Sequence, residues 1–281
     1  MRRSKAATCA VYASAALAVV VALAPFLFLV LSSAVAPVEL LRRPLHWIPR
    51  HWSLSRYNEI FTGKDGGSTT FLHAMFNSLI VAAIAVVISL AVGIFGAYAF
   101  ARLRFRFRQS LLLLFLLTYM LPPISILIPL YLIEANLNLL DTKMGLVFVY
   151  VSFIIPFVLW VMGNFFQTIP VEIEEQGRID GLGRVGVLVR IVLPLSRPGI
   201  LSTALLGFLL SWDEFLYALI FTSTNKSKTI PVAIAEFTGR HVVDFGLIAT
   251  GGVIACVPPV VIAIVFQRYI VGGLTSGALK G

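Results

Sequence analysis

The segment EEQGRIDGLGRVGVLVRIVLP, residues 174–194, is the part of this sequence whose residue types could make specific contacts with another molecule. It combines acids, arginines and glycines, and it lies between two long apolar stretches. Acids and arginines dock through charge-assisted hydrogen bonds, and glycine lets two backbones approach closely. A few residues would suffice to join two helices, so the length and polarity of this segment indicate contact with another protein.

The sequence contains no recognisable motif for catalysis, for nucleotide binding or for a metal ion. The phosphate cradle G-x-x-x-x-G-K-[ST] does not occur, since TGKD at 62–65 lacks its leading glycine. The four histidines are isolated from one another and predict no metal site. Cys9 and Cys256 both fall in predicted membrane spans and imply no disulfide framework. We therefore expect no enzyme activity and no cofactor in this chain, so energy for any uphill step must come from elsewhere.

The composition indicates a membrane protein. Of the 281 residues, 59% are hydrophobic and only 12% are charged, and the mean hydropathy is +0.94. A soluble domain carries about 25% charged residues, whereas a helix that crosses a bilayer needs about 20 mostly apolar residues. Six stretches meet that need. The sequence therefore predicts an all-α membrane protein, a single domain over residues 1–281 with six transmembrane helices at roughly 8–35, 70–101, 109–133, 144–167, 198–223 and 245–268.

The distribution of basic residues predicts the orientation of these helices. The formal net charge of +9 could suggest nucleic acid as a partner, but most Lys and Arg residues flank the spans on one side, above all in RLRFRFR at 102–108. Basic residues concentrate in loops that are not translocated. Both termini and the segment 168–197 are therefore expected in the cytoplasm, and we expect no nucleic acid partner. The first apolar run is too long for a cleaved signal peptide, so it is expected to remain as a span.

The local pattern within 168–197 predicts two short helices joined by a tight turn. Pro170 suits the first turn of a helix, where its missing N–H is not needed, and the acids that follow favour the positive end of the helix dipole. Asp180 and Gly181 predict the turn, with Asp180 capping the second helix, which should stop at Pro194. The apolar positions expected on these helices are Val171, Ile173, Ile179 and Leu182. An amphipathic helix that rests on the membrane surface is the alternative.

Two acids inside the fifth predicted span form a second candidate site. Asp213 and Glu214 lie about fifteen residues beyond Pro198, where an ionisable side chain is costly and by default functional. They could face a cavity that conducts a solute, or they could make a structural hydrogen bond to a neighbouring helix. Trp212, beside them, could stack on a sugar ring or could be an interfacial aromatic residue.

The segment 168–197 also resembles the cytoplasmic signature of ABC-importer permeases, which is E-A-A, two residues, D-G, and then I-x-L-P. Glu175-Gln176-Gly177, Asp180-Gly181 and Ile191-Val192-Leu193-Pro194 stand in that register. MLPPISILIPLYLI, SWDEFLYALIF and GGLTSGALKG are similar to the carbohydrate-uptake branch, such as the smaller permease of maltose and glycerol-phosphate importers. Gln176 and Gly177 replace both alanines of the signature, and Asp213 stands where the family usually has Asn.

The resemblance implies a type I ABC-importer permease fold with a cytoplasmic coupling-helix loop that docks on an ATPase. The residues it implies for that docking are Glu174, Glu175, Arg178, Asp180, Gly181, Leu193 and Pro194. Implied partners are a second homologous permease, a pair of ATPase subunits that carry the ATP and Mg²⁺, and an extracytoplasmic solute-binding protein, assembled in a bacterial inner membrane.

The function that follows from this resemblance is import of a sugar, oligosaccharide, polyol or sugar phosphate by an ATP-driven complex. A permease of the same kind for a non-carbohydrate solute is one alternative. A proton-coupled secondary carrier is another; Asp213 and Glu214 favour it, but the sequence shows no inverted repeat of the kind such carriers often contain. A membrane scaffold without transport activity would leave the ordered signature unexplained.

Overall fold

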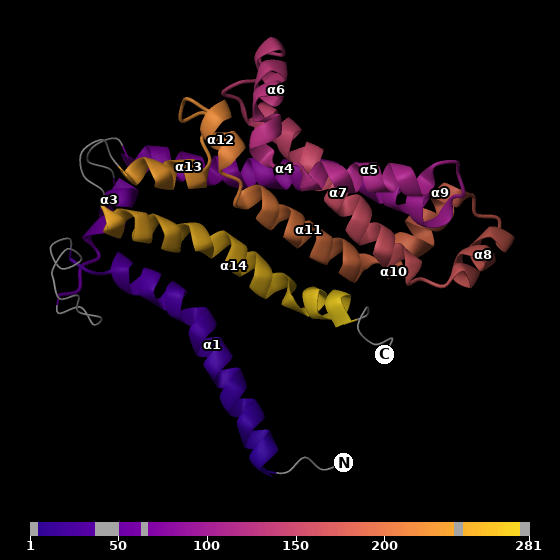
Figure 1. The fold of residues 1–281 in the computed structure, drawn as a ribbon, viewed down its shortest axis with the longest axis horizontal. Helices are drawn as coiled ribbons and strands as arrows, with labels where there is room; N and C mark the ends of the chain where they lie inside the picture. Colours follow the sequence, from indigo (N-terminus) through magenta and orange to yellow (C-terminus); the bar gives the residue numbers. More distant parts are fainter. Residues whose placement is uncertain (1–4, 37–50, 63–66, 239–243, 276–281) are drawn as a thin grey trace. The chain divides into compact units, whose positions relative to one another are not determined.

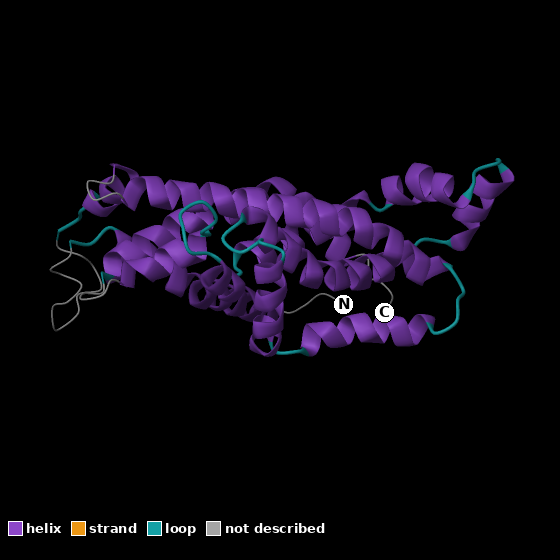
Figure 2. Cartoon of the chain, turned by 90° about the horizontal axis from the view of Figure 1, so that it is seen from above, coloured by secondary structure: helices purple, strands orange, loops and turns teal. Residues whose placement is uncertain are grey.

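The computed structural model describes residues 5–36, 51–62, 67–238 and 244–275. These residues form helices joined by short connections, and within them no β-strand occurs (Figure 2). One isolated antiparallel bridge pairs Val35 with Trp52. The predicted all-α class is confirmed.

Four helices are each long and apolar enough to cross a membrane (Figure 1). They are α1 (Lys5–Ser33), α4 (Gly67–Arg102), α7 (Lys143–Gln167) and α14 (Phe245–Thr275). Two bent pairs also meet the requirement for length and composition: α5 (Arg108–Met120) with α6 (Pro123–Asn136), at 96°, and Arg184–Leu195 with α11 (Arg197–Trp212), at 79°. The described residues therefore hold four candidate spans, or six if each bent pair is one span.

The bend between α5 and α6 occurs where the sequence removes backbone hydrogen-bond donors. Between α5 and α6 lie Leu121 and Pro122, and Pro123 begins α6; two consecutive prolines lack N–H donors and disfavour a helical residue before them. The fifth predicted span is also interrupted, because α11 ends at Trp212 and α12 (Leu216–Phe221) begins four residues later.

The chain forms two compact units, Met1–Leu72 with Ala233–Val257 and His73–Val232 with Pro258–Gly281, so the division falls within α4 and within α14. The first unit contains α1, α3 (Ser55–Thr62), the start of α14 and half of α13 (Ile230–Ala235).

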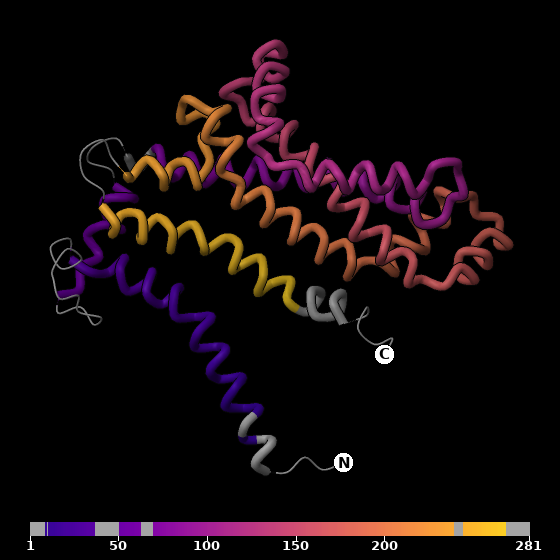
Figure 3. The backbone as a smooth tube through the Cα atoms, viewed as in Figure 1, coloured from indigo at the N-terminus to yellow at the C-terminus, as the bar shows by residue number. Residues whose placement is uncertain are grey.

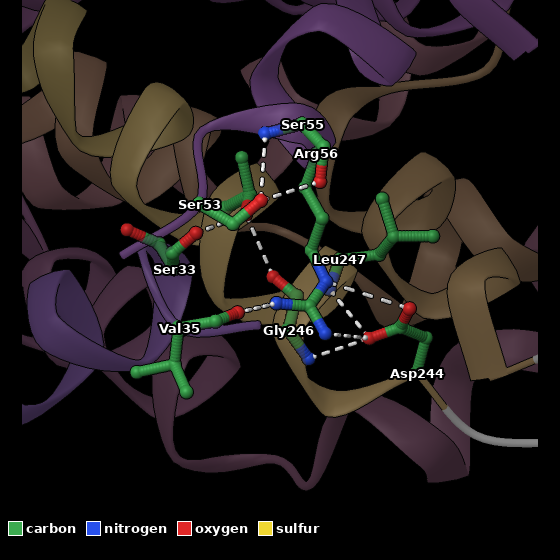
Figure 4. A network of polar contacts seen from close by, with 9 residues as sticks. Ser33, Val35, Ser53, Ser55, Arg56, Asp244, Gly246 and Leu247 are labelled. Atoms are coloured by element: carbon green, nitrogen blue, oxygen red, sulfur yellow. Dashed lines mark hydrogen bonds and ion pairs between the residues drawn. The ribbon is translucent and has the colours of Figure 1, made fainter. Parts of the chain in front are cut away.

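A polar network joins three segments of the first unit (Figure 4). The Arg56 guanidinium is buried and lies 3.2 Å from the Asp244 carboxylate. It also donates to the carbonyl of Val35. Asp244 in turn accepts the N–H groups of Gly246 and Leu247, at 2.8 and 3.1 Å, which caps the first turn of α14.

The second unit is built on a buried apolar cluster shared by α4, α7 and α12, whose helices can be followed in Figure 3. Tyr150, Ile154 and Met162 on α7 are almost fully buried, as is Val81 on α4. The same cluster includes Val187, Leu188 and Val192 from the segment that the sequence singles out as a docking element. That segment is therefore attached to the apolar core of the unit.

Two loops of the second unit are joined through the carboxylate of Asp141. Its Oδ1 accepts the backbone N–H groups of Ser223 and Thr224, both at 2.9 Å, and the Ser227 hydroxyl. Its Oδ2 accepts the Thr224 hydroxyl at 2.7 Å. Burial acts to raise the pKa of Asp141, but these hydrogen bonds to the charged form outweigh it and hold the pKa well below its usual range. The carboxylate therefore keeps the loop before α7 in contact with the residues after α12.

Candidate functional site

The predicted docking element consists of α8 (Val171–Ile179), a turn, and a second helical stretch from Arg184 to Leu195. Figure 1 shows it at one end of the second unit, beyond the end of α7. The prediction of two short helices and a tight turn is confirmed. The second stretch comprises α9 (Arg184–Val187), a π-helical turn (Leu188–Val192) and α10 (Leu193–Leu195).

Pro194 does not end the second helix, contrary to prediction, because the backbone has already changed its hydrogen bonding before it. The Leu193 N–H donates to the carbonyl of Leu188, five residues back. The helix continues to Leu195 and ends where the N–H of Ser196 donates to Val192 and Leu193. A π-helical turn before proline absorbs the loss of the proline N–H without breaking the helix.

The turn at Gly181 is a Schellman motif. Gly181 has a φ of +87°, its N–H donates to Arg178, and the N–H of Leu182 donates to Gly177. Asp180 is the C-cap of α8, whereas Gly183 stands at the N-cap of α9. The prediction that Asp180 caps the second helix is therefore wrong, because its backbone is used to end the first one.

Most of the residues that the signature implies for docking are exposed. Glu175, Arg178, Asp180, Gly181 and Pro194 all face outward, and Leu193 is half-buried.

Of the apolar positions expected on these helices, only Leu182 is partly buried. Val171 and Ile173 are exposed, and Ile179 is 85% exposed. The inward-facing positions of α8 are instead Glu174 and Gly177. The apolar periodicity of α8 thus marks an outward surface, and exposed apolar residues beside charged ones are typical of a contact with a protein or with a membrane.

Gly177, one of the two departures from the E-A-A signature, has a packing reason in this structure. A Cβ at this position would overlap the Cδ1 atom of Ile191 and would lie 3.5 Å from Val187. The missing methyl group thus leaves room for the Ile191 side chain beside α8. Gln176, the other departure, is exposed and nothing in the structure explains it.

Glu174 differs from the other implied docking residues because it is buried within the chain. Its Oε1 atom lies 2.6 Å from Nε of Arg102, and its Oε2 accepts the hydroxyl of Tyr98 at 2.8 Å. Arg102 also donates to the carbonyls of Phe166 and Ile169, at 2.8 and 2.7 Å. The sequence analysis did not identify Tyr98 and Arg102 as the partners of Glu174. The available signal was an arginine and a tyrosine four residues apart at the end of an apolar helix, on one face.

The three candidate pathway residues separate in the structure. Trp212 is buried and stacks on Phe208, with ring centroids 5.4 Å apart. It therefore does not present its ring to a solute in this structure, nor is it exposed as an interfacial residue would be.

Glu214 takes the structural role that the sequence left open. Its carboxylate accepts the Tyr150 hydroxyl from α7 at 2.8 Å and the N–H groups of Tyr217 and Ala218, at 2.9 and 3.1 Å. Asp213 is exposed, and among the described residues its carboxylate has no hydrogen bond or ion pair.

Asp213 and Glu214 lie at a pocket of about 690 Å³ in the second unit. Its other walls come from α5, α7 and α11 and are apolar or aromatic: Leu116, Tyr119, Met120, Phe157, Trp160, Leu206, Leu209 and Leu210. A mostly apolar pocket of this size with a few polar groups is typical of small-molecule sites. Across the described residues, no group of three His, Cys, Asp or Glu side chains could hold a metal ion.

Comparisons with known proteins support the resemblance seen in the sequence. Residues 89–276 match the family described as binding-protein-dependent transport system inner membrane component. The trehalose transport system permease protein SugB of Mycobacterium tuberculosis is 37% identical over 83% of this chain and 84% of its own. The sulfoquinovosyl glycerol transport system permease protein SmoH of Agrobacterium fabrum is 32% identical over 96% of this chain and 93% of its own.

A solved structure shares the fold. It is a chain of a bacterial ABC transporter involved in the import of the acidic polysaccharide alginate, with a TM-score of 0.75 at 21% identity, over 96% of this chain and 99% of that one.

Proposed function

This chain belongs to the family of binding-protein-dependent transport system inner membrane components, and we propose that it is one of two permease subunits of an ATP-driven importer of sugars or sugar derivatives. The carbohydrate class is supported by the relatives, one described as a permease for trehalose and another for sulfoquinovosyl glycerol. An oligosaccharide, a polyol or a sugar phosphate falls within the same proposal.

The observation that carries the proposal is the construction of the segment 168–197. Its core-facing residues join it to the buried cluster of the second unit, while Glu175, Arg178 and Asp180 surround an exposed tip. A rigid element with an exposed charged tip can carry a displacement from a soluble protein into the spans. A helix that merely rests on a membrane needs no such attachment to a core. We infer that the tip docks on an ATPase and that ATP hydrolysis belongs to that subunit.

The proposed partners also include a second permease and an extracytoplasmic solute-binding protein. Large apolar surfaces that the described part of the chain leaves uncovered support contact with lipid and with a second permease. None of the residues of α5 is buried, and the most apolar window of α1 has no buried residue. The orientation that fits the docking proposal has both termini and segment 168–197 in the cytoplasm.

For the solute pathway we propose the pocket beside Asp213. Tyr119 and Trp160 offer aromatic faces to a sugar ring, and the Asp213 carboxylate has free acceptor capacity for hydroxyl groups. In this proposal Trp212 packs behind the wall of the pocket. Glu214 stabilises the break between α11 and α12.

The test is purification from the native host membrane through a tag on this chain, followed by uptake measurements. We expect a second permease and an ATPase to co-purify in defined stoichiometry. Proteoliposomes loaded with ATP and supplied with the host's solute-binding proteins should take up a labelled sugar from a panel that includes trehalose. Uptake that stops with a protonophore but continues without ATP would instead identify a proton-coupled carrier. Uptake restricted to a non-carbohydrate solute would overturn the sugar class alone.

The orientation has its own experiment. A cysteine introduced for Asp180 should resist a membrane-impermeant thiol reagent applied from outside, whereas one introduced for Thr62 should react. Both positions are exposed in the structure, so burial within the chain would not explain a difference between them.

A further inference from the structure

The buried contact between α4 and α8 contains a hydrogen bond in addition to its ion pair. Tyr98 and Arg102 stand four residues apart on α4 and therefore lie on one face of that helix. Each binds a different oxygen of Glu174, at 2.8 and 2.6 Å. Two bonds from two points on α4 fix both the position and the orientation of the Glu174 carboxylate.

The same guanidinium also holds the end of α7. Its Nη2 atom donates to the carbonyls of Phe166 and Ile169, which lie in the last turn of α7 and in the connection to α8. Carbonyls at a helix C-terminus lack partners within the helix, and a cation there also favours the helix dipole. The ring of Tyr98 packs edge-on against Phe166, with centroids 6.1 Å apart. One side chain thus connects α4, α7 and α8.

Burial makes these contacts persistent. Glu174 is 1% exposed and the Arg102 side chain is 10% exposed. Water therefore has little access to replace either partner, and separating the pair would leave a charge buried without a counter-charge. The exposed ion pairs that a surface helix makes are weak by comparison.

We propose that Tyr98 and Arg102 form a strut that makes α8, α4 and the end of α7 move as one rigid body during the transport cycle. This proposal rests on the proposed function, in which α8 is displaced by an ATPase. Both residues act as positioning residues through Glu174. Without the strut, the ATPase would still dock on the exposed tip and move α8, but the movement would reach α4 incompletely.

The experiment measures a distance within the assembled complex, purified from the host through a tag on this chain. Spin labels are attached to cysteines introduced at Val87 on α4 and Ile173 on α8, both exposed, in a background with Cys9→Ser and Cys256→Ser. The distance distribution is recorded without nucleotide and with ATP plus vanadate. We expect the same distribution in both states when the strut is intact.

Three substitutions weaken the strut in different ways. Arg102→Lys keeps the charge but loses the planar guanidinium group, which can donate to several acceptors at once. Tyr98→Phe removes one hydroxyl, and Glu174→Gln removes the charge. The matched controls are Arg104→Lys and Glu172→Gln, which change exposed residues near the same helix ends.

Arg102→Lys and Tyr98→Phe should shift or broaden the distance distribution in ATP plus vanadate only, while the ATPase stays bound and hydrolyses ATP. Glu174→Gln should change the distance distribution in the same direction. The controls should behave as the unaltered complex does. If Arg102→Lys does not fold, Tyr98→Phe carries the test, because it leaves the ion pair in place.

Two results would overturn the strut: a distance that already changes with nucleotide in the unaltered complex, or unchanged distributions in both Arg102→Lys and Tyr98→Phe. Failure of the proposed function itself would look different, because the unaltered chain would then purify without an ATPase.

Discussion

The hydroxyl of Tyr150 on α7 donates a hydrogen bond to the carboxylate of Glu214, 2.8 Å away in the break between α11 and α12. The same carboxylate accepts the first free N–H groups of α12, from Tyr217 and Ala218. An acid within a predicted span is thus satisfied on one side by a neighbouring helix and on the other by a helix N-terminus, which favours negative charge.

Loss of this contact should destabilise the second unit. Glu214→Ala leaves the Tyr150 hydroxyl and two N–H groups without their acceptor, at a cost of about 3 kcal/mol, so thermal unfolding of the purified complex should occur at a clearly lower temperature. Glu214→Gln, which keeps one acceptor oxygen, should lose less. Equal unfolding temperatures for Glu214→Ala and the unaltered chain would contradict this structural role.

Substitution of Asp213 should change the uptake of solute rather than the stability of the fold. Asp213→Asn keeps an acceptor oxygen and should retain uptake within about threefold. Asp213→Ala should raise the KM for the solute about tenfold, as expected when one charge-assisted hydrogen bond is lost. Unfolding temperature serves as the control, because this carboxylate makes no hydrogen bond or ion pair within the described residues. Unchanged rate and solute preference in Asp213→Ala and in well-assembled Glu214→Ala would reject the proposed pathway.

The Asp141 contact predicts a dependence of stability on pH. Because folding lowers the pKa of Asp141, its contribution is complete above the pKa of an unfolded aspartate, about 3.9, and it is lost as the pH falls toward the folded value. Unfolding measured between about pH 6 and pH 3 should therefore show a steeper loss of stability in the unaltered chain than in Asp141→Asn. Parallel curves for the two proteins would show that the carboxylate contributes nothing.

Two serines bonded to Asp141 provide a matched pair. Ser227 donates through its side chain, whereas Ser223 donates through its backbone N–H. Ser227→Ala should cost about 1 to 2 kcal/mol, and Ser223→Ala should cost almost nothing. The comparison is made by thermal unfolding at neutral pH, where equal losses would contradict the assignment of donors.

Substitutions at the tip of the docking element should uncouple the complex without unfolding the spans. Gly181→Trp adds bulk at the exposed turn, and Glu175→Lys reverses an exposed charge. Both should lose uptake and either release the ATPase on purification or leave its activity unresponsive to the solute-binding protein. Normal uptake by Gly181→Trp in a complex of full stoichiometry would remove the case for docking at this turn.

A comparison of two glycines near the turn separates the effect of backbone conformation from the effect of steric contact. Gly181 has a positive φ and Gly183 has a φ of −69°, and a Cβ on either glycine would meet open space. Gly181→Ala should therefore destabilise the segment by about 1 kcal/mol, whereas Gly183→Ala loses only the preference of the N-cap for glycine over alanine and should destabilise it less. Proteolysis within 168–197 of the assembled complex would report this difference.

Substitution of Gly177 tests whether side-chain packing or helix propensity selects the residue at this position. Ala is favoured over Gly in a helix by about 1 kcal/mol, but its methyl group would overlap Cδ1 of Ile191. Gly177→Ala combined with Ile191→Val, which removes that carbon, should be more stable than Gly177→Ala alone. Identical unfolding temperatures for the single and the double variant would show that the contact is not what selects glycine.

Length, apolar composition and charge distribution were sufficient to predict an all-α membrane protein, because the width of a bilayer imposes a minimum length on each apolar segment. The two short helices and the Gly181 turn were predictable for a similar reason. Proline at a helix start and glycine at a turn act through local backbone geometry, which depends only on neighbouring residues.

The inward and outward faces of α8 required the tertiary structure. Its apolar side chains Ile173 and Ile179 face outward, while Glu174 is buried, an arrangement opposite to the one its polarity suggests. Glu174 can be buried because Tyr98 and Arg102, more than seventy residues earlier in the chain, satisfy both of its oxygens. Likewise, Trp212, Asp213 and Glu214 are consecutive in sequence, but they take different roles because each meets a different neighbour: Phe208, the open pocket and Tyr150. Partners distant in the sequence decide which polar groups can be buried, and only the folded arrangement of helices brings those partners together.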